Sequence, residues 1–247
     1  MTQQPLTEHT TGTTTQYGDG KSPNGRTPLS RGHILAAALA YTDQHGLQAL
    51  SMRKLAAELD VEAMSLYNHI DNKDDILVGI ADLVFAEVVI PSSASGSWDE
   101  RTREVAESAR QALAAHEQIV PIILAGSNRG PAYLHMMESG VGALREAGFS
   151  ADMAHHGWHT LVAHVLGYVL QQTATPMLVS SAVAGRQLAS DRTNRSLPLA
   201  DLPASDFPHI VEIAPYLAQC ATDDEFEFGL DVILAGLKRK LSGNTNR

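Results

Sequence analysis

Cysteine, aromatic residues and long apolar runs are all scarce in this sequence. Its 247 residues include one cysteine, Cys220, so no internal disulfide is possible, which fits a reducing compartment. Aromatic residues make up 5% of the chain, whereas alanine and leucine abound, and this composition favours helices over strands. No apolar run reaches the ~18 residues of a membrane span, and the N-terminal residues lack the apolar core of a signal peptide. We therefore expect a cytoplasmic protein with no membrane partner.

Positive charge is scarce as well. The chain has 18 Lys plus Arg against 28 Asp plus Glu, a net charge of -10, which argues against non-specific binding of polyanions. Specific binding stays compatible with this balance, because a few cations on one face can contact phosphates while the remaining surface is acidic. Hydrophobic residues make up 44% of the chain, enough for a sizeable core.

Composition divides the chain into three parts. Residues 1–29 are rich in Thr, Gly, Gln and Pro, which predicts a disordered N-terminal arm. The GDGKS stretch in this arm is not a phosphate-binding loop, since Thr15 stands where the first glycine is required. The segment PSSASGS at 91–97 is a plausible boundary, so we expect domains at 30–90 and 91–247.

Helical periodicity accounts for the rest of the chain, and no strand pattern is present. In 30–90 we predict a helix from Ser30 to Gly46, a second capped by Ser51, a turn at Asp60, a third at about 63–70, and a fourth from Asp71 or Asn72 to about Ile90. Further helices are expected at 98–116, 117–125, 130–147, 150–172, 206–219 and 223–241. The stretch 173–205 is ambiguous, with a loose helix around 180–189. The predicted fold is all-α.

The third helix is too short to be stable by propensity alone. Leu66 and Ile70 must dock it on the first two helices, and docking holds its other face outward. A short rigid helix after a tight turn fits the major groove of DNA, so residues 51–70 are interpreted as a helix-turn-helix. The alternative is a small helical hairpin with ordinary surface residues.

Residue chemistry assigns roles on this motif. Phosphate contacts are expected from Ser51, Arg53, Tyr67, His69 and Lys73, and base-edge contacts from Ala63, Met64, Ser65 and Asn68. In the arm, Lys21 and Arg26, followed by Arg31, could reach a minor groove or phosphates, and a solvated arm without contact is the open alternative.

The stretch GLQALSMRKLAAELDVEAMSLYNHIDNKDDIL resembles the DNA-binding domain of TetR-family repressors. Leu66, Tyr67 and His69, followed by Asn72 and Lys73, match the family's core motif, whereas Asp60 replaces its usual glycine. The stretches WDERTREVAESARQAL, REAGFS, LGYVLQQ and FEFGLDVILAGLKRKL are similar to the effector domain of the tetracycline repressor branch.

The resemblance implies a ligand-responsive repressor that binds a near-palindromic operator in double-stranded DNA. It implies a homodimer through a four-helix bundle, formed here by about 150–172 and 206–219. Ligand binding would move the fourth helix and change the separation of the two recognition helices. Family habit points to control of an exporter or of antibiotic-related genes.

The resemblance also locates an inducer site, but this sequence lacks the branch's metal and drug ligands. Apolar residues stand there instead, so we expect a bulky, mostly apolar inducer rather than magnesium-tetracycline, and no cofactor. The ligand-contacting candidates are Val105, Ala109, Leu124, Ser127, Met136, Met137, Gly140, Trp158, His159, Ala163 and His164.

The cluster HHGWH at 155–159 places His155 and His159 one helical turn apart. His156 occupies the position of a zinc protease's catalytic Glu and no third ligand is evident, so no metal site is predicted. No nucleophile elbow, paired-carboxylate motif or glycine-rich nucleotide loop is present, so we expect no enzyme. The alternative function is a helical small-molecule-binding protein or a histidine-based metal sensor without operator binding.

Overall fold

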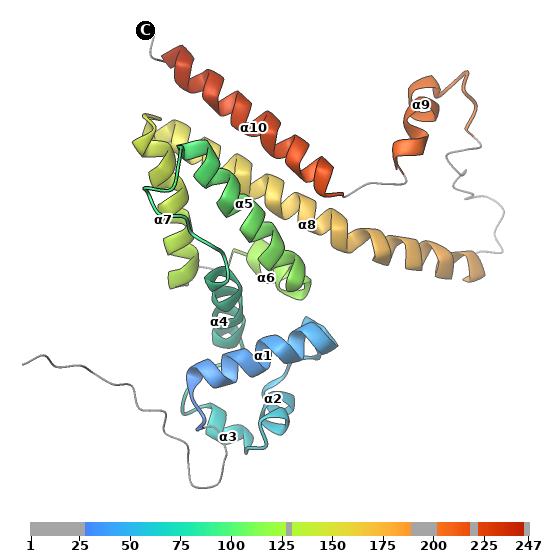
Figure 1. Ribbon diagram of the computed structural model, residues 1–247. Helices are drawn as coiled ribbons and strands as arrows, with labels where there is room; N and C mark the ends of the chain where they lie inside the picture. Colours follow the sequence, from blue (N-terminus) through green and yellow to red (C-terminus); the bar gives the residue numbers. More distant parts are fainter. Residues whose placement is uncertain (1–27, 127–129, 189–201, 218–221, 245–247) are drawn as a thin grey trace, which may run out of the picture.

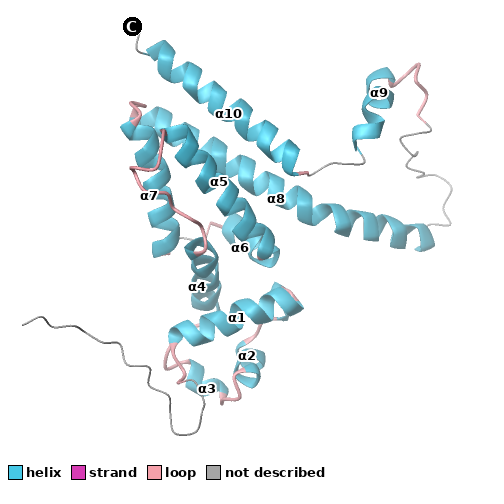
Figure 2. Cartoon of the chain, in the orientation of Figure 1, coloured by secondary structure: helices cyan, strands magenta, loops and turns pink. Residues whose placement is uncertain are grey.

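The computed structural model describes residues 28–126, 130–188, 202–217 and 222–244. In these ranges all regular structure is helical, which confirms the predicted all-α fold (Figure 2). The elements are α1 (Arg31–His45), η1 (Leu47–Ala49), α2 (Met52–Glu58), α3 (Ala63–Leu66), α4 (Lys73–Ala86), α5 (Trp98–Ala115), η2 (Glu117–Ile119), α6 (Val120–Leu124), α7 (Pro131–Glu146), α8 (Ala151–Leu188), α9 (Pro208–Leu217) and α10 (Asp223–Asn244).

Helices α1, α2 and α3 pack together at one end of α4 (Figure 1). Helices α1 and α2 start at the caps that the sequence predicts: the Ser30 side chain accepts from the backbone N–H of His33, and the Ser51 side chain accepts from that of Lys54. Asp60 has φ 52°, the left-handed conformation expected for the turn between α2 and α3.

Helix α3 is shorter than predicted, ending at Leu66 rather than at residue 70. The backbone tightens after it, because Asn68 and His69 donate to carbonyls three residues back, those of Ser65 and Leu66. Docking holds the segment as expected: Leu66 is 0% exposed and Ile70 is 1% exposed.

Helix α4 starts where the sequence predicts, since the Asn72 side chain accepts from the backbone N–H of Asp75. It ends at Ala86 rather than at about Ile90. The physical reason is tertiary: the Val89 N–H donates to the hydroxyl of Ser108 on α5, at 2.8 Å, instead of continuing the helix.

The larger part of the molecule contains α5, α7, α8 and α10, and the far end of α4 meets it at α5, α6 and α7 (Figure 1). Helix α8 corrects the predicted end near residue 172, because it runs for 38 residues to Leu188, and it contains most of the loose helix expected at 180–189. Pro176 lies within this helix and lacks the backbone N–H that would donate one of its hydrogen bonds. Helix α10 lies along α8, whereas α9 stands away from the packed helices.

Candidate functional site

The outward face of α2, α3 and the start of α4 carries the residues predicted to contact DNA. Met64 is 73% exposed and Tyr67 is 47% exposed. The other exposed members of this set are Arg53, Asn68, His69 and Lys73, and Ala63, Ser65 and Ser51 are half-buried. The Ser51 hydroxyl is already the cap of α2. Lys54, which the sequence analysis did not single out, is exposed beside Arg53.

Of the three arm cations named from the sequence, only Arg31 lies within the described residues; Lys21 and Arg26 lie outside them. Both terminal nitrogens of Arg31 donate to the Asp75 carboxylate at 2.6 Å. This hydrogen bond lowers the pKa of Asp75 below its usual value. Arg31 thus ties the start of α1 to the first turn of α4, so its guanidinium is engaged in an ion pair within the protein.

A cavity lies between α4, α5, α6, α7 and α8. The space among its side chains, together with the open solvent at its mouth, measures about 750 Å³. Its lining is Phe85 from α4; Thr102, Val105, Ala106, Ala109 and Leu113 from α5; Ile123 from α6; Tyr133, Met136 and Gly140 from α7; and Trp158, Leu161, Val162, Val165 and Leu166 from α8.

Five of the sequence-predicted ligand residues line this cavity: Val105, Ala109, Met136, Gly140 and Trp158. The sequence analysis missed Phe85 and Tyr133, whose rings lie 5.0 Å apart and join α4 to α7 in the cavity wall. No sequence signal places these two rings together, because they are separated by 48 positions and only the crossing of α4 and α7 makes them neighbours.

The other predicted ligand residues that the structure describes lie elsewhere. Leu124 is 52% exposed, and His159 and Ala163 lie on the exposed face of α8. His164 faces α10, where its Nε2 donates to the Phe226 carbonyl at 3.0 Å and its ring stacks on Phe226. Met137 packs half-buried against the core outside the lining, and Ser127 lies outside the described residues.

The cavity lining is almost entirely apolar. Among its residues only Thr102, Tyr133 and Trp158 carry an O–H or N–H group, and the Thr102 hydroxyl donates to the Trp98 carbonyl at 2.7 Å. Among the described residues, which leave out 127–129 between α6 and α7, the lining has no carboxylate, imidazole or cationic side chain. Because transferring a charge into such surroundings is costly, this cavity favours neutral molecules.

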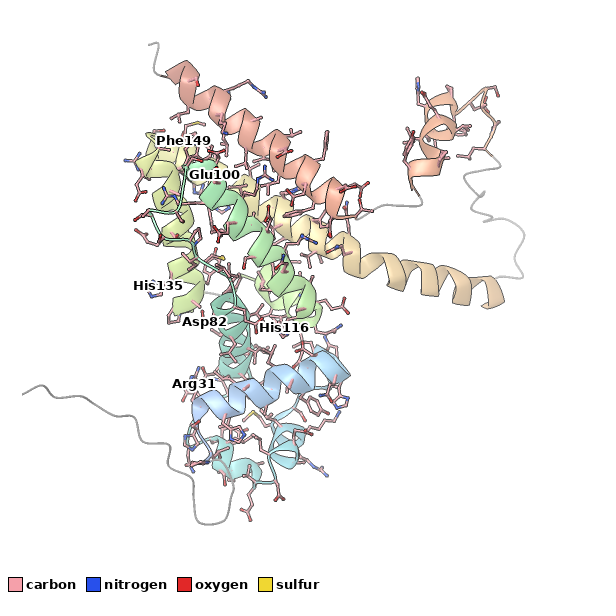
Figure 3. The ribbon with its side chains drawn as sticks, in the orientation of Figure 1. Arg31, Asp82, Glu100, His116, His135 and Phe149 are labelled. Carbon is pink, nitrogen blue, oxygen red and sulfur yellow. The ribbon has the colours of Figure 1, made fainter. Side chains whose placement is uncertain are left out.

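Asp82 connects two helices of the cavity wall, α4, on which it lies, and α7. Its Oδ1 accepts from the backbone N–H groups of Ala132 and Tyr133 at 2.9 and 3.2 Å, at the start of α7 (Figure 3). Helix α7 has no side-chain cap of its own, since Gly130 occupies the cap position. A Cβ at Gly130 would stand 2.2 Å from the Asp82 carboxylate oxygen, so glycine is what lets α4 approach.

His116 makes a second link, between the two parts of the molecule (Figure 3). It follows α5, and its Nδ1 lies 2.8 Å from the Asp43 carboxylate on α1. Its Nε2 lies 3.3 Å from the carboxylate of Glu87, directly after α4. One imidazole therefore contacts the α1–α3 group, the end of α4 and α5 together.

The histidines at 155–159 are not gathered into a metal site. His155, His156 and His159 are all exposed on α8, and His156 lies 3.3 Å from Asp152 one turn earlier. Among the residues that the structure describes, no group of three or more His, Cys, Asp or Glu side chains is placed to hold a metal ion. In the same part of the chain, no helix is long and apolar enough to cross a membrane.

Two protein families match this chain. Residues 34–80 match the family described as "Bacterial regulatory proteins, tetR family", and residues 90–241 match "Tetracyclin repressor-like, C-terminal domain". The first match covers α2 and α3 with most of α1 and α4, and the second covers the cavity-lining helices α5 to α8 together with α10.

Individual relatives agree. An HTH-type transcriptional regulator from Saccharopolyspora erythraea is 35% identical over 58% of this chain and 58% of that protein. The tetracycline repressor protein class A from transposon 1721, of Escherichia coli, is 32% identical over 87% of this chain and 94% of that protein. These relatives are transcriptional regulators, not enzymes.

Among solved structures, apo ActR from Streptomyces coelicolor is 32% identical, with a TM-score of 0.74, covering 88% of this chain and 99% of that one. ActR in complex with actinorhodin matches with a TM-score of 0.70, covering 87% of this chain and 99% of that one, again at 32% identity.

Proposed function

Because the chain belongs to the tetR family of transcriptional regulators, with a helix-turn-helix DNA-binding domain and a ligand-binding C-terminal domain, we propose a specific mode of action. The protein binds a near-palindromic operator as a homodimer and represses transcription. A bulky, mostly apolar small molecule releases it. Residues 30–90 form the DNA-binding domain with its connecting helix, and 91–247 form the ligand-binding and dimerisation domain.

One observation carries this proposal: α4 contributes both to the DNA-contacting surface and to the wall of the cavity. Its first residue, Lys73, is exposed beside the recognition helix, and near its other end Phe85 forms part of the cavity wall. Any ligand that displaces Phe85 acts on the helix that positions the DNA-contacting surface. Asp82 and His116 restrict this helix further, since they attach it to α7, α5 and α1.

The proposed DNA contacts follow the exposed face of α2 and α3. Ala63, Met64, Ser65 and Asn68 are assigned to base edges, whereas Ser51, Arg53, Tyr67, His69 and Lys73 are assigned to the phosphates. Met64 offers only apolar contact, for example to a thymine methyl group, so Asn68 is the residue of this set best suited to bidentate hydrogen bonding with a base.

The proposed dimer uses α8 and α10 in place of the predicted pairing of α8 with residues 206–219. Helix α10 lies along α8, and its outer face has two large exposed apolar residues one turn apart, Phe228 at 72% and Val232 at 54%. A second copy of the same face would bury this stripe in a four-helix bundle. Phe228→Glu should convert the dimer to monomers in sedimentation experiments, whereas a monomeric parent protein would contradict the bundle.

The apolar lining supports a neutral inducer. It argues against magnesium-tetracycline, because Mg²⁺ prefers oxygen ligands such as carboxylates and the described residues of the lining include no carboxylate. ActR, which is similar in fold, has been solved with actinorhodin, and this supports an organic ligand of comparable bulk. Control of an exporter or of antibiotic-related genes is part of the same proposal.

Binding to the DNA upstream of the protein's own gene tests the function directly. In a gel shift, the native protein should bind this DNA specifically and in a salt-sensitive manner. Lys73→Ala should weaken binding to all sequences, whereas Asn68→Ala should change the preferred sequence. Absence of specific binding would refute the repressor proposal and favour the small-molecule-binding alternative.

A further inference from the structure

Gly140 on α7 and Trp158 on α8 form an unusually close pair in the cavity wall. A Cβ built on Gly140 would stand 2.1 Å from Cζ3 of Trp158, 2.7 Å from Cε3 and 3.1 Å from Cη2. The six-membered ring of the indole therefore lies directly against the glycine backbone. The Trp158 side chain is 5% exposed, so this position is enforced by packing on its other sides.

Any side chain at position 140 must displace this indole. Distances below 3.0 Å between a Cβ and a ring carbon do not occur in relaxed structures, and a rigid ring cannot yield at its end as a flexible side chain does. Both residues line the cavity, so the empty space beside the ring is where the indole can go. Glycine at 140 thus keeps the ring in the wall and the cavity wide.

The aromatic surfaces define the chemistry of a matching ligand. Trp158 lies on α8, and the rings of Phe85 and Tyr133 lie 5.0 Å apart on α4 and α7. The other described lining residues are aliphatic or glycine apart from Thr102, and none of them carries a charge. Offset stacking on the indole is favourable for a flat π-system, and burial of apolar area stabilises the complex further.

We infer that Gly140 determines the largest ligand that the cavity admits, by holding the Trp158 ring in the wall, and that this ligand is a neutral fused-ring aromatic molecule. The inference deepens the proposed function, since it names the ligand class and a specificity-determining residue of the proposed inducer site. It assigns to Gly140 the control of ligand size, and to Trp158 the stacking surface.

The chain provides a matched control for a substitution at this position. Gly142 lies two residues further along α7, and a Cβ there would meet nothing within 4 Å. Gly140→Ala and Gly142→Ala therefore add the same methyl group to the same helix, but only the first one reaches the indole. The chain has two tryptophans, and Trp98, which packs on Phe149 outside the lining, can be replaced by Phe. Trp158 then becomes the only tryptophan reporter.

The experiment titrates naphthalene and anthracene into three proteins, the Trp98→Phe parent and its Gly140→Ala and Gly142→Ala variants, following the quenching of Trp158 fluorescence. For each probe, Gly142→Ala should bind with the same affinity as the parent. Gly140→Ala should lose about tenfold or more in affinity for anthracene, a loss of about 1.4 kcal/mol in binding free energy. Its affinity for the smaller naphthalene should stay within about threefold of the parent's. Trp158→Leu removes the obstructing ring together with the stacking surface, so adding it to Gly140→Ala should recover part of the lost anthracene affinity, measured by the probe's own emission.

Equal anthracene affinities for Gly140→Ala and Gly142→Ala would overturn the role of Gly140. If the parent bound neither probe, the assigned ligand class would be wrong. If circular dichroism shows that Gly140→Ala does not fold, Trp158→Phe provides the test. Its smaller ring should let the larger probe pyrene bind with higher affinity than in the parent, and no gain in pyrene affinity would refute the inference. None of these measurements involves DNA, so their failure is separable from failure of operator binding.

Discussion

Replacing Asp82 is the most informative single change outside the DNA-contacting surface. Its Oδ1 accepts from the N–H groups of Ala132 and Tyr133, and α7 has no side-chain cap of its own. Asp82→Ala leaves both N–H groups without this acceptor. Asp82→Asn keeps a carbonyl oxygen of the same size and position, and it is the matched control.

The expected loss can be worked out from the contacts. Removing an N-cap acceptor costs about 0.5–2 kcal/mol, and the carboxylate is at the stronger end, because hydrogen bonds to a charged acceptor are about twice as strong as neutral ones. With two N–H groups affected at a half-buried site, we expect Asp82→Ala to lower the free energy of unfolding by about 2 kcal/mol. Asp82→Asn should lose less than about 1 kcal/mol, chiefly its interaction with the helix dipole.

Urea denaturation provides the first measurement, with the midpoint falling and the slope unchanged. Amide hydrogen exchange provides the second and more local one. The amides of Ala132 and Tyr133 should exchange faster by about tenfold or more in Asp82→Ala, since local opening becomes easier, and Asp82→Asn should stay near the parent. Equal destabilisation by Ala and Asn, or unchanged exchange at these amides, would refute the idea that α4 caps α7.

Three further predictions concern stability and salt. Gly142→Ala should raise the free energy of unfolding by about 0.5–1 kcal/mol, as an unhindered glycine-to-alanine change in a helix does, whereas Gly140→Ala should show no gain in the same urea titration because of the indole. The lowered pKa of Asp75 stabilises the folded state above the ordinary carboxyl value of about 3.9, and this contribution is lost as the pH falls through the lowered folded pKa. Asp75→Asn should therefore weaken the acid dependence of thermal unfolding below about pH 4. The change in the free energy of unfolding should be less than about 1 kcal/mol, because Arg31 is half exposed. An unchanged acid dependence would contradict the ion pair. Finally, the DNA-contacting face has three exposed cations per protomer, on α2 and at the start of α4. In a plot of the logarithm of the operator-binding constant against the logarithm of salt concentration, a dimer should therefore give a slope no steeper than about -5. A much steeper slope would require phosphate contacts from elsewhere.

The sequence by itself determined the elements that depend on neighbouring residues. Ser30, Ser51 and Asn72 cap helices where the sequence predicts, because a cap is a contact over three positions. Asp60 takes the left-handed turn for an equally local reason. The helical periodicity and the Leu-Tyr-x-His motif were sufficient for the fold class and the family.

The site was predictable only in part. Val105, Ala109, Met136, Gly140 and Trp158 line the cavity. The resemblance placed Val105, Ala109 and Gly140 at ligand positions, and Met136 and Trp158 were expected as contacts of a bulky ligand. His159 and His164 do not line it, because the rotation of α8 about its axis places the first on the surface and the second against α10. Helical periodicity predicts which face of a helix is apolar, but it does not predict which helix or cavity that face contacts.

Only the tertiary structure decided which distant residues meet. Asp82 caps a helix that begins 49 positions later, Phe85 meets Tyr133, and Gly140 lies under the ring of Trp158. These contacts arise from the angles and distances at which α4, α7 and α8 cross, and those are set by the packing of all the helices together. Caps and periodicity act over a few residues along the chain, whereas a cavity is the space left between helices that are far apart in sequence.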